Sequence, residues 1–127
     1  MDLMETAYAI NEWSKEKGWD SRVEGNPGKF SEKMLLIISE VIEAMEEFRN
    51  NHPVDQIYYH YPTSREAESR DLDPHLPKPE GVPIELADTV IRILHFCAAN
   101  NIALDEAIKI KMAYNKTRPF RHGGKVM

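Results

Sequence analysis

The sequence has a single cysteine, Cys97, and therefore cannot form an intrachain disulfide. A lone cysteine fits a reducing compartment, so we expect a cytoplasmic protein. No apolar run approaches the ~20 residues that span a bilayer, and the N-terminus lacks the apolar stretch of a signal peptide. The net charge of −5 and the absence of a long basic run argue against non-specific binding to nucleic acid. We expect neither a membrane nor a nucleic-acid partner, and a phosphate-bearing ligand would need local cations or metal ions.

Common catalytic signatures are also missing from the sequence. It has no Walker loop, no Rossmann glycine fingerprint and no cysteine–histidine spacing of the zinc type. No Ser-His-Asp or Cys-His system is evident. Glu-x-x-His pairs, which a di-iron carboxylate bundle requires, are absent as well. Any enzymatic chemistry must therefore come from other polar groups.

What the sequence does contain is helical periodicity. Its 127 residues are enough for one domain with a real core, and we expect residues 1–127 to form that domain. Apolar residues recur at helical spacing in four segments, which are residues 3–17, 30–50, 83–100 and a stretch beginning near Leu104. Asp2 is a suitable N-cap for the first segment, and Gly18 marks its end. We predict an all-α fold of four helices.

The segment 83–100 combines an apolar circumference with a narrow polar stripe. Pro83 suits a first helical position. On a helical wheel the polar side chains fall within roughly 80°; they are Glu85, Asp88, Arg92 and His95. A helix so apolar over the rest of its circumference is expected to be buried. Acidic groups are seldom buried unless they are paired or bind a metal.

The segment 30–50 carries a broad apolar arc that predicts a core-facing helix, with Ser31 as a suitable cap. The arc comprises Met34, Leu35, Ile37, Ile38, Val41, Ile42, Met45 and Phe48. Three acids lie on the opposite side, with Lys33 and Leu36 among them; they are Glu40, Glu43 and Glu47. Taken alone, this side is typical of a solvated acidic face. Leu36 and the second acidic pair on segment 83–100 instead favour a packed surface.

Two carboxylates three residues apart lie on one face of a helix, within reach of a shared cation. Glu40 and Glu43 form one such pair, and Glu85 and Asp88 form another. Magnesium prefers hard oxygen ligands and is usually held by carboxylates together with substrate phosphates. We therefore predict that the two pairs meet in a magnesium cage that holds a triphosphate.

Residues 51–82 interrupt the helical pattern with repeated prolines, which predicts a long loop between the second and third helices. Loops of this length are usually functional or disordered. The aromatic run at 57–61 is unusual for a disordered linker. It is consistent with packing on a partner subunit, with covering the site, or with a short ordered segment in the core.

Several further residues are candidates for contacting a nucleotide. Trp13 and Trp19 either pack in the core or form a wall for a nucleobase. Lys111 and Asn115 lie one helical turn apart, and Lys33 lies near the acidic face. The basic, glycine-containing segment 117–127 is either a solvated terminus or an arm that grips phosphate. The candidates for substrate binding are Lys33, Trp19, Lys111, Asn115, Arg118, Arg121 and Lys125.

These motifs together resemble the MazG-like all-α nucleoside triphosphate pyrophosphatases. The resemblance is carried by Glu40-x-x-Glu43 and Glu85-x-x-Asp88, and it covers most of the chain except roughly residues 51–77. Four further stretches of this chain resemble a subgroup of that family. They are Asn11-Glu12-Trp13, Gly18-Trp19-Asp20, Lys78-Pro79-Glu80-Gly81 and the closing Asn115 to Lys125. Many members carry an acid where this chain has Ser39, and Glu47 is a candidate replacement.

The resemblance implies a four-helix module that forms a homodimer or homotetramer. It implies magnesium-dependent hydrolysis of a (deoxy)nucleoside triphosphate to a monophosphate and pyrophosphate, as in nucleotide-pool housecleaning, with Mn²⁺ as an alternative ion. Glu40, Glu43, Glu85 and Asp88 would be metal ligands. Glu40 and Glu43 would be the catalytic residues, with Glu43 orienting the attacking water.

Two other functions stay open at this point. Phosphoribosyl-ATP pyrophosphatase shares the helical fold and the chemistry, although the aromatic loop and the C-terminal motif fit it less well. The other is a non-catalytic helical interaction module, in which the acids form a solvated or partner-binding face.

Overall fold

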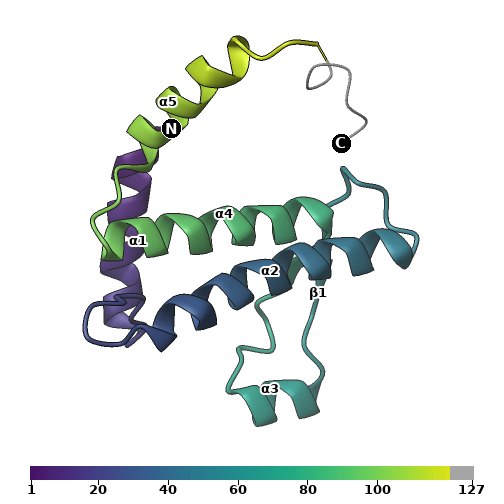
Figure 1. Ribbon diagram of the computed structural model, residues 1–127. Coiled ribbons are helices and arrows are strands. Elements are labelled where there is room, and N and C mark those ends of the chain that lie inside the picture. The colour runs from purple at the N-terminus through teal and green to yellow at the C-terminus, as the bar shows by residue number, and fades with distance from the viewer. Residues whose placement is uncertain (121–127) are drawn as a thin grey trace. The chain divides into compact units, whose positions relative to one another are not determined.

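The structure is a computed structural model that describes residues 1–120, and it is mostly helical (Figure 1). The chain divides into two compact units, each described by itself. Unit 1 comprises residues 1–24 and the chain from Leu94 onward, and unit 2 comprises Gly25–Ile93. The elements of the described residues are α1 (Leu3–Glu16), α2 (Gly28–Arg49), β1 (Tyr58–His60), α3 (Ser64–Arg70), β2 (Lys78–Glu80), α4 (Val82–Ala99) and α5 (Leu104–Lys116). The four predicted helices are present, so the all-α prediction is confirmed at this level.

Unit 1 is built from α1, the C-terminal end of α4, and α5. Its core is small: Ala7, Leu94 and Ala98 are buried together, with partly buried residues around them. The surrounding residues are Leu3, Met4, Ile10 and Leu104. Asp2 caps α1 as predicted, because its side chain accepts a hydrogen bond of 2.9 Å from the Glu5 amide.

The segment after α1 is held by polar contacts within unit 1. Gly18 ends the helix with φ +77°, and the Trp19 amide donates to the Ser14 carbonyl at 2.9 Å. Asn100 then fixes the segment from two sides. Its Oδ1 accepts from the Val23 amide at 2.9 Å, and its Nδ2 donates to the Ser21 carbonyl at 2.8 Å.

Unit 2 contains α2, the residues of α4 up to Ile93, and the connection between these helices. We call this connection, residues 50–81, the β1–β2 excursion. β1 and β2 pair antiparallel, with Tyr58 opposite Glu80 and His60 opposite Lys78. In the sequence, α3 falls between the two strands. The predicted long connection over residues 51–82 therefore contains short ordered segments, which was one of the alternatives that the sequence left open. The prolines do break the chain, but strands of three residues are too short to show the alternation by which strands are recognised.

Two helices begin one or two residues earlier than the sequence predicts. α2 begins at Gly28 after Pro27, so Ser31 lies inside the helix and does not cap it. α4 begins at Val82, which makes Pro83 the second helical residue. Proline is tolerated there because the first amides of a helix have no intrahelical partner.

The apolar arc of α2 does not face the core of unit 2. Most of its members are exposed, including Leu35 at 64% and Phe48 at 62%. Leu86, Val90 and Ile91 of α4 are also exposed, at 41–49%, so the prediction of a fully buried helix was wrong for this part of α4. Within unit 2, α4 instead contacts the acidic side of α2, where Arg92 donates to Glu40. We call the exposed residues Leu35, Ile38, Val41, Ile42, Met45, Phe48, Leu86, Val90 and Ile91 the apolar surface of unit 2.

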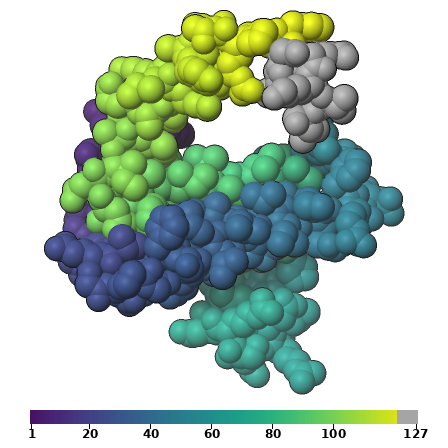
Figure 2. Space-filling view, in the orientation of Figure 1, coloured from purple at the N-terminus to yellow at the C-terminus, as the bar shows by residue number. Residues whose placement is uncertain are grey.

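Figure 2 shows α2 open to the viewer along its length, with no other segment of unit 2 lying over that side. Within residues 1–120, no helix combines the length and the apolar character that crossing a membrane requires.

Candidate functional site

The candidate site lies in unit 2, where α2 and the first turns of α4 run side by side (Figure 1). Glu40 and Glu43 are one turn apart on α2, and Glu85 opens the first turn of α4. Each of the three offers a carboxylate oxygen, and these oxygens all lie within 4.8 Å of one another. Two helices therefore bring three of the four predicted ligands together.

Glu40 is the buried member of this group, with 5% of its surface exposed. Its Oε1 accepts a hydrogen bond of 2.9 Å from Nε of Arg92, on α4. Its Oε2 is buried, and no hydrogen-bond partner reaches it from the described residues. A buried oxygen of this kind is costly unless a proton, a water or a cation completes it.

Glu85 titrates far above the usual range of a glutamate. Partial burial is the main cause, and the neighbouring Glu43 and Glu40 add to it, so that the pKa of Glu85 rises from 4.5 to about 8. Like charges at close range cannot all be ionised at low energetic cost. Near neutral pH the group therefore tends to keep a proton on Glu85, at the place where a cation would also be stabilised.

Asp88, the fourth predicted ligand, lies beside this group but not within it. The set of oxygens within 4.8 Å of one another comprises Glu40, Glu43 and Glu85. Burial and the charge of Glu40 raise the pKa of Asp88, while Arg92 and Lys78 act in the opposite direction. The aspartate is thus electrostatically coupled to Glu40 and stands next to the three carboxylates.

Glu47, the candidate replacement for an acid at Ser39, has a different role. Tyr58 of β1 donates its hydroxyl to both carboxylate oxygens of Glu47, at 2.9 and 2.7 Å. His52 stacks on the Tyr58 ring with centroids 4.5 Å apart. Hydrogen bonding to Glu47 raises the pKa of the Tyr58 phenol, so the hydroxyl keeps its proton and the contact. Glu47 anchors the β1–β2 excursion to α2, while Ser39 donates to the Leu36 carbonyl at 2.6 Å.

Lys33 is half-buried on α2, seven residues before Glu40. A spacing of seven places it on the same side of the helix, about two turns or roughly 10 Å along the axis from Glu40. It therefore borders the acidic group without being part of it.

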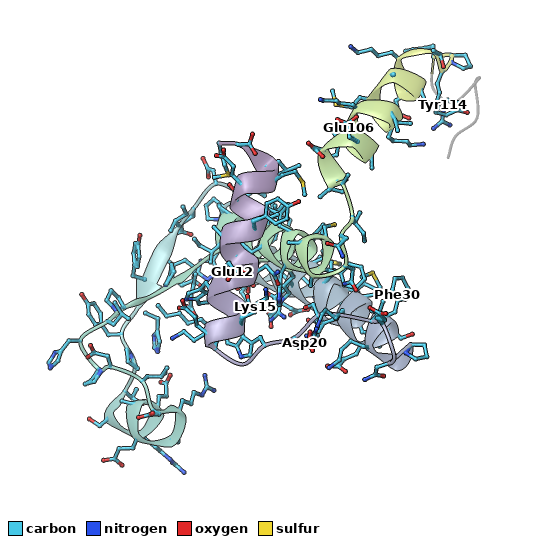
Figure 3. All side chains as sticks on the ribbon, turned by 90° about the vertical axis from the view of Figure 1, so that its left-hand side faces the viewer. Glu12, Lys15, Asp20, Phe30, Glu106 and Tyr114 are labelled. Atoms are coloured by element: carbon cyan, nitrogen blue, oxygen red, sulfur yellow. The ribbon has the colours of Figure 1, made fainter. Side chains whose placement is uncertain are left out.

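Trp19 belongs to unit 1, where it borders a cavity of about 460 Å³. The cavity is lined by Asn11, Lys15, Gly18, Trp19, Asp20, Arg22, Ala98, Ala99 and Asn101. Figure 3 shows Glu12 and Lys15 on α1 with Asp20 on the segment that follows. Trp13 and Trp19 meet edge to face with centroids 5.1 Å apart, yet each keeps about half of its surface exposed. The two tryptophans thus pack on each other, and Trp19 also presents aromatic surface at a cavity that has both polar and apolar lining residues.

The remaining substrate-binding candidates lie on or after α5, in unit 1. Lys111 places its Nζ 5.0 Å from the centre of the Tyr114 ring, a cation–π contact on the exposed helix. Asn115 is exposed one turn further on, and Arg118 follows the end of the helix. Arg121 and Lys125 lie outside the described residues. The carboxylate group belongs to unit 2, and the structure describes the two units separately.

Two residues of unit 2 had no assigned role in the sequence. Arg92 was placed on the polar stripe but was not given a partner, although a single arginine among acids on an apolar helix is a usable signal. Tyr58 carries no such signal, because its contact with Glu47 joins residues 11 positions apart in different elements.

Chemically, the site is an all-oxygen group suited to a hard divalent cation. Comparisons of this chain with models of protein families, with curated proteins and with solved structures found no match.

Proposed function

We propose that this protein hydrolyses (deoxy)nucleoside triphosphates to a monophosphate and pyrophosphate in a magnesium-dependent reaction, as nucleotide-pool housecleaning requires. The observation that carries the proposal is the meeting of Glu40, Glu43 and Glu85 from two helices, with one buried oxygen of Glu40 left unpaired. The resemblance of the acidic pairs to those of the MazG-like family supplies the reaction.

The residues present fit a magnesium ion. The three donors are carboxylates, which are the hard oxygen ligands that Mg²⁺ and Mn²⁺ accept. The unpaired Oε2 of Glu40 is the kind of buried atom that a cation would satisfy. Glu40, Glu43 and Glu85 would hold the ion, with Asp88 beside them as a fourth ligand. When bound, the ion supplies charge neutralisation for a triphosphate and lowers the pKa of a coordinated water.

The three glutamates differ in exposure, and this suggests different roles. Glu40 is buried and Glu85 is partly buried, so both suit holding a cation. Glu43 is the exposed member, and a water from solvent can reach it. We assign to Glu43 the task of orienting this water and accepting its proton, as a general base within hydrogen-bond reach.

A nucleotide also needs contacts for its base and phosphates. Trp19, at the edge of a cavity lined by both polar and apolar residues, offers an aromatic surface for a nucleobase. Lys33 lies on the acidic side of α2 and can approach a phosphate that is bound there. Lys111, Asn115, Arg118, Arg121 and Lys125 are proposed as nucleotide contacts because the family resemblance implies that role for this part of the chain.

The proposed enzyme works as a homodimer or homotetramer. The support is the apolar surface of unit 2, which includes several large aliphatic side chains and Phe48. Several large apolar side chains exposed along one face of a helix are typical of an interface that is covered in solution. A second copy of this chain is the proposed covering partner.

Phosphorus NMR tests the reaction directly. The purified protein is incubated with magnesium and each common (deoxy)nucleoside triphosphate in turn, and then with phosphoribosyl-ATP. Monophosphate and pyrophosphate are the expected products. Diphosphate and orthophosphate would contradict the proposed bond cleavage, and turnover of phosphoribosyl-ATP alone would favour phosphoribosyl-ATP pyrophosphatase.

Substitutions of the carboxylates test the site. Glu40→Gln and Asp88→Asn are expected to abolish turnover while the helical circular dichroism spectrum is retained, because each removes a charge that the cation needs. Glu46→Gln is the matched control, since Glu46 lies on the same helix, is exposed and pairs with Arg49 at 3.0 Å. Wild-type rates in the Glu40 and Asp88 variants would exclude a role for these carboxylates in catalysis.

A non-catalytic interaction module is the second candidate function, and the exposed apolar surface of unit 2 is the observation that favours it. The two functions differ in their response to ligands. An enzyme of the proposed kind is stabilised against heat by a nucleotide only when magnesium is present, whereas an interaction module shows no such dependence.

A further inference from the structure

Arg92 is the cation that contacts the buried member of the carboxylate group. It lies on α4 one turn after Asp88, on the same polar stripe as Glu85. Its Nε donates to Oε1 of Glu40 at 2.9 Å, and its side chain is 39% exposed while that of Glu40 is 7% exposed. The contact therefore joins a partly solvated guanidinium to an almost fully buried carboxylate.

Because of this contact, the two carboxylate oxygens of Glu40 differ in their hydrogen bonding. Oε1 is engaged by Arg92, and Oε2 has no hydrogen-bond partner among the described residues. A carboxylate is planar, so fixing one oxygen restricts the position of the other. The arginine thus limits the rotation of Glu40, one oxygen of which lies within 4.8 Å of oxygens from Glu43 and Glu85.

The local charges give the same contact a second effect. Three carboxylates lie together and the charge of Glu40 also acts on Asp88, so mutual repulsion would drive these side chains apart. Arg92 places a permanent positive charge against Glu40, since a guanidinium stays protonated at any relevant pH. The group can therefore remain assembled before a metal arrives.

We propose that Arg92 is a positioning residue, which holds Glu40 so that its free oxygen is part of a preformed metal site. The proposal rests on the proposed function only in requiring that the carboxylates bind a divalent cation. Residues that orient metal ligands commonly change metal affinity by about 10–100-fold when they are removed.

Binding of Mn²⁺ to the full-length protein tests this without any turnover. The electron paramagnetic resonance signal of free aqueous Mn²⁺ is measured during a titration, and thermal unfolding is followed on the same samples. Arg92→Gln is expected to weaken binding at least about tenfold. Arg49→Gln is the matched control, because Arg49 is an exposed arginine of the same unit paired with Glu46 rather than with the site, and it is expected to bind as wild type does.

Arg92→Lys separates positioning from packing. A lysine keeps the positive charge but donates from a single flexible point, so it is expected to retain an affinity between those of wild type and Arg92→Gln. Rescue by lysine at an unchanged melting temperature supports the proposal. If Arg92→Gln binds Mn²⁺ as tightly as wild type, or if both variants lose affinity only in proportion to a lowered melting temperature, the positioning role is overturned. If wild type itself fails to bind Mn²⁺, the proposed metal site falls and the role of Arg92 falls with it.

Discussion

At the residue scale, the protonation of Glu85 makes the stability of the folded protein depend on pH. Burial and the neighbouring acids raise its pKa to about 8 in the folded protein, against 4.5 when it is unperturbed. Between these two values the folded protein binds a proton that the unfolded chain has released. Without metal, stability is therefore highest below about pH 4.5 as far as Glu85 is concerned, and it falls as the pH rises toward 8.

We predict that urea unfolding in the presence of a chelator gives a lower free energy at about pH 8.5 than at about pH 5.5, and that magnesium reduces the difference. The cation replaces the proton that relieves repulsion at low pH. Glu85→Gln is the control, since it removes this titrating group and leaves all other residues unchanged. A pH dependence that is identical in wild type and Glu85→Gln would contradict the assignment.

Much of the site could be predicted from single residues and their spacing. The i, i+3 pairs predicted which carboxylates share a face, and Glu40, Glu43 and Glu85 do meet. The sequence predicted that Asp88 joins them in one cage, but Asp88 is not among the oxygens that lie within 4.8 Å of one another. Spacing could not decide this, because it does not say how two helices are rotated against each other. The pairing of Arg92 with Glu40 depends on the same rotation and could not be predicted.

At the element scale, the β1–β2 excursion is fastened to both helices that carry the site. Tyr58 binds Glu47 on α2, one turn after Glu43. At the other end Gly81 leads directly into α4, and its carbonyl accepts from the Glu85 amide at 3.1 Å. The excursion thus connects the two carboxylate-bearing helices near their acidic residues, and we expect its fastening to influence the alignment of Glu43 and Glu85.

A substitution of Gly81 tests how much the connection between the β1–β2 excursion and α4 contributes to stability. It has φ +121°, and a Cβ at this position would lie only 2.2 Å from the Gln56 carbonyl oxygen. We predict that Gly81→Ala destabilises the protein by roughly 3–5 kcal/mol, from backbone strain and steric overlap together. Chemical denaturation measures the loss.

Gly18→Ala is the matched control for this prediction. Gly18 also has a positive φ, +77°, but nothing lies within 4 Å of the added Cβ. Its substitution is expected to cost only the strain of the left-handed conformation, roughly 1–2 kcal/mol. Equal losses in the two variants would show that the close approach to Gln56 has no energetic consequence.

The elements themselves were predicted unevenly. The four long helices follow from periodicity, and α1 begins at its predicted cap. The direction of the α2 apolar arc was wrong, because periodicity identifies an apolar face but not what covers it. The excursion depends on contacts such as Tyr58 with Glu47, which join distant residues and leave no local pattern.

At the scale of the whole molecule, the apolar surface of unit 2 bears on association. We predict that the wild-type chain sediments as a dimer or tetramer, and that Phe48→Glu shifts it toward the monomer, because a buried charge without a partner is strongly unfavourable. Analytical ultracentrifugation measures the shift.

Val54→Glu is the control, since Val54 is exposed to the same degree but lies outside the apolar surface. It is expected to leave the association unchanged. A wild-type protein that is monomeric at high concentration would contradict the proposed interface.

Cys97 has a consequence of a different kind. Its side chain is buried in the C-terminal part of α4, and burial raises the pKa of the thiol. The thiolate is the nucleophile that attacks an alkylating reagent, so burial and protonation both protect the Cys97 sulfur from modification. Modification must wait for a fluctuation that opens α4. Since the sequence holds no second cysteine, each labelled molecule reports one such opening. The rate of Cys97 labelling therefore reports how often this part of α4 opens.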